Sequence, residues 1–331
     1  MNPTLAFPQA PTIRTYHHPT PTGQIYILDS NPSPSNTPPH PTPKPTLLLI
    51  HGNSSCTRIW HPLLTATPLT QTHRVLALDL PGHGCSDNAS TPGDVYTMRG
   101  YAGCILTLLT TLGVDRCSVL GWSLGGHVAL EMLSLIRSNP SSTSKLDSKL
   151  DSKLDSKLTS GSTLEIDIKG VMLVGTPPSY TRAQVARAFT KDPPCPALPL
   201  ASKDSLTADE ICMFATAITG PPFESWQVDA VARTDGVSRE TMFTTFAAGG
   251  GVDQVGVVED EAARGEDGVV FSVVNGVEDP FINLDYMDGL GWGRLVGGEC
   301  VRMEGLGHAP FWEDVERFFP YLVEFLGVCQ K

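Results

Sequence analysis

The sequence predicts an α/β fold: a mostly parallel central sheet flanked by helices and carrying a helical cap insertion. From residue 46 onward, apolar runs of strand length alternate with turn signals and helical patterns, which is typical of consecutive βαβ units. The runs are continuous rather than alternating, as expected for strands that helices cover on both faces. They occupy residues 47–50, 74–79, 117–120, 171–174, 269–274 and 300–303.

The N-terminal 45 residues have a different composition, rich in Pro, Thr, Ser and Asn. Two short strand-like runs, residues 12–17 and 24–29, predict a hairpin at the edge of the sheet. The proline-rich residues 31–45 cannot form a central strand, because proline cannot donate to a ladder of backbone hydrogen bonds. We expect them to form a loop that leads into the parallel part of the sheet.

Between residues 177 and 249 the strand-like runs stop and helical patterns replace them. Thr207 followed by Glu210 is a capping box that predicts the start of a helix, and Gly220 followed by two prolines predicts its end. We therefore expect an α/β core formed by residues 1–176 and 250–331, and a helical cap formed by residues 177–249 that packs over the sheet.

Residues 144–158 read SKLDSKLDSKLDSKL, a repeat of four residues. In a helix this period would place lysine over lysine and aspartate over aspartate, which lowers helix stability. We expect a disordered, solvated insertion between a helix and the strand at residue 171. A tag for a binding partner is the alternative.

Composition excludes several classes of function. The net charge is −12, and no basic run is interleaved with aromatic residues, so we expect no nucleic-acid partner. No apolar stretch reaches the roughly 18 residues of a membrane span, and the N-terminus lacks a signal-peptide pattern. The eight cysteines are scattered, which is typical of free thiols in a reducing compartment. These patterns predict a cytoplasmic protein, and they leave its oligomeric state open.

No motif indicates a cofactor or a metal. The sequence contains no GxxxxGK[ST] loop, no GxGxxG that opens a helix after a strand, and no HExxH or paired Cys/His spacing. We therefore expect neither a cofactor nor a metal ion.

The sequence GWSLG at residues 121–125 directly follows an apolar run and precedes a helical pattern. A strand, a sharp turn and a helix are the context in which GxSxG exposes a serine hydroxyl as a nucleophile. Only very small side chains fit beside such a tight turn. On the pattern alone, however, an ordinary turn explains the residues equally well.

Four further segments accompany this motif: HGNS at residues 51–54, DLPGHGCS at 79–86, GVEDPF at 276–281 and GLGHAPF at 305–311. With GWSLGG they occur in the order typical of the α/β-hydrolase superfamily, which the chain resembles from about residue 24 to residue 327. The repeat at 144–158 and the acidic stretch at 259–267 depart from the family pattern, and both fall between motifs.

The resemblance implies a catalytic triad. A serine hydroxyl needs a base, and the base needs a group that fixes its tautomer. Ser123 matches the nucleophile, His308 the base and Asp279 the acid, with Glu278 as the adjacent alternative. Of the other histidines, His51 and His83 match structural loop positions, His127 lies on the helix behind the nucleophile, and the remaining five fall in surface-like segments. Asp79 matches a structural turn, for which we expect a hydrogen-bonding role.

The resemblance also implies an oxyanion hole formed by the backbone amides of Asn53 and Leu124. For the substrate pocket we expect Trp122 together with Met213, Phe214 and Trp226 of the cap. Ile218, Met242, Phe243 and Phe246 are further candidates, although most residues at helical spacing belong to a core.

We therefore expect a serine hydrolase of the carboxylesterase type, which cleaves an ester or related acyl bond of a small, largely apolar molecule through an acyl-enzyme intermediate. A carbon–carbon bond hydrolase, a lipase and a thioesterase share these motifs. A receptor that binds its ligand without turnover is the alternative from another class. HGN also resembles dehalogenases and epoxide hydrolases, but their nucleophile is an aspartate at the position of Ser123.

Overall fold

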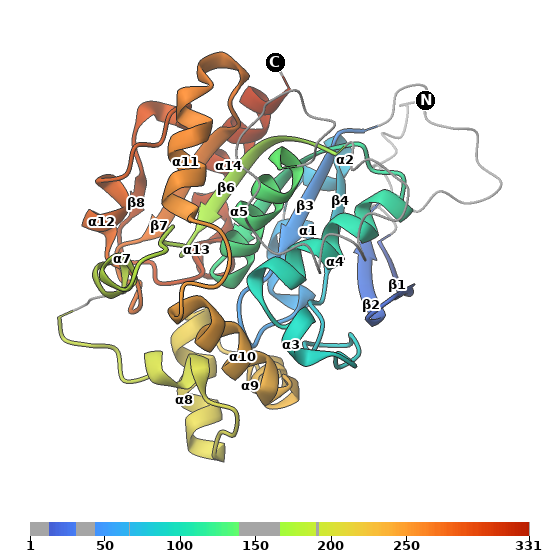
Figure 1. Ribbon diagram of the computed structural model, residues 1–331, viewed down its shortest axis with the longest axis vertical. Coiled ribbons are helices and arrows are strands. Elements are labelled where there is room, and N and C mark those ends of the chain that lie inside the picture. Colours follow the sequence, from blue (N-terminus) through green and yellow to red (C-terminus); the bar gives the residue numbers. More distant parts are fainter. Residues whose placement is uncertain (1–12, 31–43, 66, 139–165, 190–191, 331) are drawn as a thin grey trace, which may run out of the picture.

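The computed structural model describes residues 13–30, 44–65, 67–138, 166–189 and 192–330. Eight strands form one sheet in the order β1-β2-β4-β3-β5-β6-β7-β8 (Figure 1). In this order every strand from β4 to β8, β3 included, is parallel to its neighbours in that range. The predicted fold class is confirmed. The strands are β1 (Arg14–Thr20), β2 (Gly23–Asp29), β3 (Thr46–Ile50), β4 (Arg74–Leu78), β5 (Arg116–Trp122), β6 (Asp167–Val174), β7 (Val270–Gly276) and β8 (Val301–Met303).

The predicted edge hairpin is present: β1 and β2 pair antiparallel, and β2 pairs antiparallel with β4. β1 extends three residues beyond the predicted end and includes Pro19, which lies opposite Gln24. A proline is tolerated there because β1 is the outermost strand. Residues 31–43 of the proline-rich loop and the whole repeat at 144–158 lie outside the described residues.

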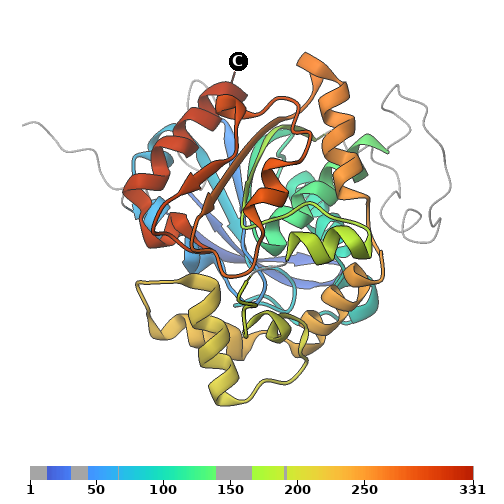
Figure 2. The same ribbon diagram turned by 90° about the vertical axis from the view of Figure 1, so that its left-hand side faces the viewer.

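Helices cover both faces of the sheet (Figures 1 and 2). Leu48 and Ile50 of β3 belong to one apolar cluster and Leu47 and Leu49 to another, and all four are buried. Burial on both faces explains why the apolar runs are continuous. The first cluster includes α4 (Met98–Thr111), α5 (Leu124–Arg137) and α11 (Gln254–Ala263), and the second includes α1 (His61–Thr65), α13 (Pro310–Glu313) and α14 (Val315–Cys329).

Most of the helices between residues 177 and 249 lie together beyond one end of the sheet, where Figures 1 and 2 show α8, α9 and α10 in yellow to orange. α8 begins with the predicted capping box of Thr207 and Glu210 and ends at Gly220. α7 instead packs against α12. The helices of this segment are α7 (Arg182–Ala188), η2 (Leu198–Ser202), α8 (Ala208–Thr219), α9 (Ser225–Arg233) and α10 (Gly236–Ala247).

A third apolar cluster joins these helices to the loop that follows β7. It contains Phe214 and Ile218 of α8 together with Phe281 and Ile282. The cap therefore packs directly on a segment two residues beyond Asp279. The remaining short helices are η1 (Thr57–Trp60), α2 (Leu69–Thr72), α3 (Pro92–Val95), η3 (Gly265–Asp267), α12 (Leu284–Asp288) and η4 (Val296–Gly298).

Candidate active site

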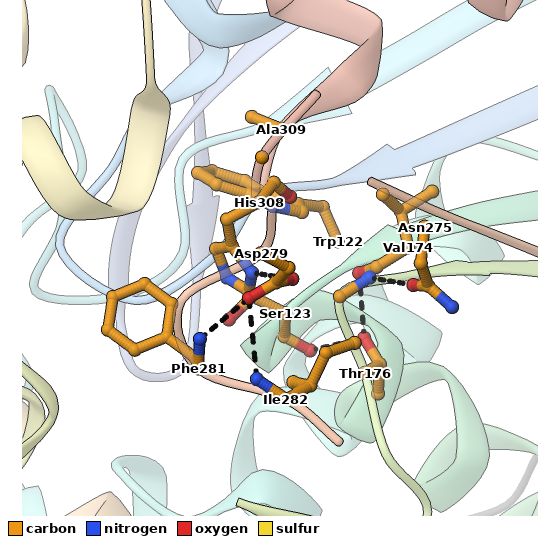
Figure 3. Close-up of polar contacts among 12 residues, drawn as sticks. Trp122, Ser123, Val174, Thr176, Asn275, Asp279, Phe281, Ile282, His308 and Ala309 are labelled. Atoms are coloured by element: carbon orange, nitrogen blue, oxygen red, sulfur yellow. Dashed lines mark hydrogen bonds and ion pairs between the residues drawn. The ribbon is translucent and has the colours of Figure 1, made fainter. Parts of the chain in front are cut away.

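Ser123 occupies a sharp turn between β5 and α5. Its backbone angles are φ 53° and ψ −120°, a region that residues with side chains rarely adopt and that costs of order 1–3 kcal/mol. Two bonds hold the turn: the Ser123 amide donates to the Val174 carbonyl at 2.8 Å, and the Thr176 hydroxyl donates to the Ser123 carbonyl at 2.8 Å (Figure 3). The surrounding sheet thus enforces a strained backbone at this serine.

Glycines flank the turn because other backbone and side-chain atoms approach it closely. A Cβ on Gly121 would lie 2.6 Å from the Gly125 carbonyl oxygen. A Cβ on Gly125 would overlap the Ile50 carbonyl at the end of β3, and one on Gly126 would overlap the Thr176 side chain. Packing against neighbouring atoms therefore requires glycine at these three positions, in addition to the tightness of the turn.

Asp279 and His308 form a buried pair next to this turn. Asp279 follows β7 and His308 follows β8, and Nδ1 of His308 lies 2.6 Å from Oδ2 of Asp279. Oδ1 of Asp279 accepts hydrogen bonds from the amides of Phe281 at 2.8 Å and Ile282 at 3.4 Å (Figure 3). A carboxylate held this way keeps the proton on Nδ1 and leaves Nε2 with a free lone pair. Glu278, the adjacent alternative, is exposed.

The structure brings this pair and Ser123 to one cavity, which both His308 and Ser123 line. Gly175, directly after β6, has φ +59°, and a Cβ there would lie 2.6 Å from His308 Cε1. Gly52 is equally close to the nucleophile, because a Cβ on it would lie 3.0 Å from the Ser123 Cβ. The imidazole and the serine thus pack against glycines at the ends of β6 and β3.

The two backbone amides predicted for the oxyanion hole are those of Asn53 and Leu124. Within the described residues, neither the Asn53 amide nor the Leu124 amide donates a hydrogen bond to the protein. Leu124 is the first residue of α5, where an amide has no partner inside the helix. The Asn53 side chain is fixed, because its Nδ2 donates to the Ala201 carbonyl at 2.9 Å and its Oδ1 accepts from the Ser54 hydroxyl at 3.1 Å.

The HGN and DLPGHG loops are held by buried polar groups. His51 Nδ1 donates to the Gly52 carbonyl at 2.7 Å, and its Nε2 accepts from the Leu80 amide at 3.0 Å. Asp79 accepts from the amides of Thr57 at 2.6 Å and Cys85 at 2.7 Å. Burial lowers the pKa of both His51 and His83, which favours their neutral forms. These residues fix the loops, as expected.

The cavity encloses about 630 Å³ of empty space, part of it open to solvent, and its lining is mainly apolar. Of the predicted pocket residues, Trp122 and Phe214 lie in the lining, as do the four further candidates. The lining is Gly52, Asn53, Met98, Trp122, Ser123, Leu124, His127, Gly175, Phe189, Leu198, Ala201, Phe214, Ile218, Met242, Phe243, Phe246, Phe281 and His308.

Two predicted pocket residues lie elsewhere. Met213 is 46% exposed, because it lies one helical step from Phe214 and therefore faces solvent. Trp226 packs edge-on against Trp312, with ring centroids 5.3 Å apart, and is buried in the second apolar cluster. Sequence reasoning missed Phe189 and Leu198, which lie outside the long helical patterns and are brought to the cavity by tertiary packing alone.

In the part of the chain that the structure describes, no three His, Cys, Asp or Glu side chains converge as they would around a metal ion. None of the helices in that part combines the length and the apolar character needed to cross a bilayer.

The sequence pattern that defines the alpha/beta hydrolase family matches residues 47–320. This span includes most of the chain and every site residue described above, so the chain belongs to the alpha/beta hydrolase family. The eight-stranded sheet and the turn at Ser123 agree with this assignment.

Among solved structures, the chain is similar to the N-acyl homoserine lactonase AidH in complex with N-hexanoyl homoserine, with 32% identity and a TM-score of 0.78, over 97% of this chain and 98% of that one. The esterase RhEst1 from Rhodococcus sp. ECU1013, at 20% identity and a TM-score of 0.62 over 95% and 98% of the chains, shares the fold.

Among curated proteins, the chain is similar to the pimeloyl-[acyl-carrier protein] methyl ester esterase of Aeromonas hydrophila, with 36% identity over 27% of this chain and 32% of that protein. The first curated relatives are matched over only 24% to 34% of their own length.

Proposed function

We propose that this protein is a serine hydrolase that cleaves an ester bond of a small molecule with a largely apolar acyl group. The observation that carries the proposal is the 2.6 Å contact between His308 and Asp279 beside the strained turn at Ser123. A nucleophile, a base and a group that orients the base are the minimum set for acyl transfer from serine.

In the first step, Nε2 of His308 removes the Ser123 proton while Oγ attacks the substrate carbonyl. The negative charge that develops on the carbonyl oxygen is stabilised by the free amides of Asn53 and Leu124, each worth about 3 kcal/mol where such donors have been removed. Asp279 stays ionised and stabilises the imidazolium through Oδ2. His308 then gives its proton to the leaving alcohol.

In the second step, water attacks the acyl-enzyme, with His308 as general base, and Ser123 is released. The apolar lining supports an acyl chain as the group that remains bound between the two steps. Phe214, Ile218 and Phe243 of the cap line the cavity together with Trp122 of the core. Burial of apolar chain against such a lining stabilises by about 25 cal/mol per Å².

A cyclic ester that bears an acyl chain is a second candidate substrate. The observation that favours it is the 32% identity, over nearly the whole chain, to a lactonase that acts on N-acyl homoserine lactones. Ring opening of such a lactone would use the same three residues. A lipase, a thioesterase and a carbon–carbon bond hydrolase remain rivals, because they share the triad, and a receptor without turnover is the rival from another class.

The test compares the wild-type protein with Ser123→Ala on p-nitrophenyl hexanoate, a thioester, a vinylogous diketone and N-hexanoyl homoserine lactone. We expect the wild type to hydrolyse the ester or the lactone and a fluorophosphonate probe to label it. Ser123→Ala should lower kcat by more than about 10⁴-fold, since removal of a nucleophilic serine has cost about 10⁶-fold, and circular dichroism should show the fold unchanged. Undiminished turnover in this variant, or a wild type that the probe does not label, would contradict the proposal.

A further inference from the structure

One polar side chain in the cavity has no part in the proposed reaction. The indole N–H of Trp122 donates to the His308 carbonyl at 2.8 Å, and the other side chains with nitrogen or oxygen in the described lining are Asn53, Ser123, His127 and His308. Ser123 and His308 carry the chemistry, and the Asn53 side chain is engaged with Ala201 and Ser54. His127 remains, surrounded by apolar residues such as Phe246, whose ring centroid lies 5.2 Å from the imidazole.

The contacts of His127 fix which of its nitrogens carries the proton. Nδ1 lies 2.8 Å from Oε1 of Gln254. The Ser179 amide, which can only donate, points to the same atom at 3.4 Å, so this atom is an oxygen that accepts. Nδ1 therefore carries the hydrogen and donates it to Gln254. In the neutral ring, Nε2 then presents a lone pair.

This lone pair is unused. His127 is only 5% exposed, and within the described residues its Nε2 has no hydrogen-bond partner. Nε2 of His83 also lacks a partner and is fully buried, whereas Nε2 of His127 keeps some accessible surface. Because the residue lines the cavity and is otherwise buried, the accessible space is the cavity itself. A buried acceptor without a partner is costly, and a ligand that donates to it removes that cost.

We propose that His127 Nε2 is a specificity site that accepts a hydrogen bond from a hydroxyl or an amide N–H on the acyl part of the substrate. This inference rests on the proposed function, since it assumes that the cavity holds an acyl group attached to Ser123. It adds a polar requirement to a pocket whose other walls select only for apolar character.

The chemistry of the site excludes a negatively charged ligand group. Burial lowers the pKa of His127 to about 4, so the ring is neutral at neutral pH. With Nδ1 committed to Gln254, a neutral ring offers no free N–H to a carboxylate or a phosphate. The group that meets Nε2 must itself bring the hydrogen.

The position of His127 limits where the donor lies on the substrate. Ser123 is the N-cap of α5, and the amide of His127, four residues further along, donates to the Ser123 carbonyl at 3.4 Å. Both side chains line the same cavity. We therefore place the donor on the acyl part of the substrate rather than on its leaving group.

The test uses two pairs of p-nitrophenyl esters that differ only in the donor: 4-acetamidobutanoate against its N-methyl amide, and 3-hydroxyhexanoate against 3-methoxyhexanoate. In the wild type, kcat/KM should be about tenfold higher for the donor-bearing member of at least one pair, the effect of one hydrogen bond. The pair that responds identifies the donor as an amide or a hydroxyl. Equal rates within both pairs would overturn the inference.

Variants connect the preference to the imidazole. In His127→Leu the ratio within the responding pair should fall to about one, whereas in Met242→Leu, a similar-sized change elsewhere in the lining, it should persist. A ratio unchanged in His127→Leu would refute the assignment. Labelling by a fluorophosphonate shows that each variant is folded, and a second substitution, His127→Phe, replaces His127→Leu if that protein fails to label.

Affinities separate this inference from the proposed function. The dissociation constants of the same esters for Ser123→Ala, measured by calorimetry, should show the same tenfold preference. If Ser123→Ala still hydrolyses the esters, the proposed nucleophile is wrong, and the donor preference is read from the rates instead. Equal affinities and equal rates contradict the role of His127 whatever the nucleophile is.

Discussion

The core and the cap hold their parts of the candidate site in different ways. In the core, backbone geometry places the chemistry: Ser123 lies on a turn enclosed by glycines, and Asp279 is fixed by two backbone amides. In the cap, buried side chains hold separate segments together, and one of them is Arg239 of α10. It is 4% exposed and donates to the carbonyls of Lys203 at 2.9 Å and Asp204 at 3.0 Å.

Arg239 also reaches the core loop that carries Asn53, one of the two proposed oxyanion donors. Its Nη1 lies 3.4 Å from the Ser54 hydroxyl, which in turn donates to Asn53. Ser54 has φ 57°, so this loop, like the turn at Ser123, is strained. Burial lowers the pKa of Arg239, and the nearby carboxylates of Asp204 and Asp235 oppose that shift.

The surfaces differ as well. Of the four large apolar side chains exposed in the described residues, Met213, Phe223 and Val237 lie in the cap, at 46%, 60% and 39%, and Val323 lies in the core. We therefore expect the core to tolerate few substitutions, because its backbone is closely packed. The cap tolerates change except at the few side chains that join it to the core.

The largest expected effect is on the chemistry of the core. Asp279→Asn should lower kcat about 10⁴-fold, because an amide cannot hold the His308 proton on Nδ1. The measurement is turnover of p-nitrophenyl hexanoate, with the fold checked by circular dichroism. Glu278→Gln is the matched control, since that carboxylate is exposed, and it should change kcat less than twofold. Equal losses in the two variants would contradict the assignment.

The next effect is on stability. Gly125→Ala should destabilise the protein by more than about 3 kcal/mol, because the new Cβ meets the Ile50 carbonyl. A Cβ at Gly327 in α14 would have no atom within 4 Å, so Gly327→Ala should stabilise the protein by roughly 0.5–1 kcal/mol through helix propensity. Chemical denaturation measures both. If both variants show the same stability, backbone packing does not constrain the turn.

A smaller effect is expected at Arg239, which joins α10 to residues 203–204 of the cap and contacts Ser54 of the core. Arg239→Met keeps the apolar stem but leaves the carbonyls of Lys203 and Asp204 without their donor, which should cost about 2–3 kcal/mol. It should also lower kcat more than it raises KM, since Asn53 loses its support. Arg182→Met, at an exposed arginine of α7, is the control and should change stability by less than about 0.5 kcal/mol. An Arg239 variant with normal kcat would show that the cap and the oxyanion loop are independent.

The smallest effect is expected on the cap surface. Met213→Ser should change the unfolding free energy by no more than about 0.5 kcal/mol and leave kcat/KM unaltered. Phe214→Ala, one residue further, should cost about 3–5 kcal/mol, because that ring is 1% exposed and lines the cavity. Chemical denaturation and ester turnover of the two variants test whether Phe214, and not Met213, lines the cavity. Similar effects in both variants would contradict this placement.

The sequence predicted best what local patterns determine. Continuous apolar runs located the parallel strands, since burial on both faces leaves no polar positions, and the residues around Ser123 were recognisable because a tight turn restricts their size. The pocket lining was predicted only in part. Met213 and Phe214 are equally apolar in the sequence, and only tertiary packing decides which of them faces the cavity. The role of Arg239 depends on carbonyls distant in the sequence, which leave no local signal.

The third apolar cluster has a consequence for exchanging caps between members of the family. Phe281 and Ile282 pack with the cap through their side chains, while their amides hold Asp279. A transplanted cap made of residues 177–249 alone would therefore meet a foreign surface beside Asp279, the proposed catalytic acid. We therefore expect the smallest transferable unit to be the cap together with residues 280–284. A graft that includes these residues should keep Asp279 in position while it changes which acyl group the pocket accepts.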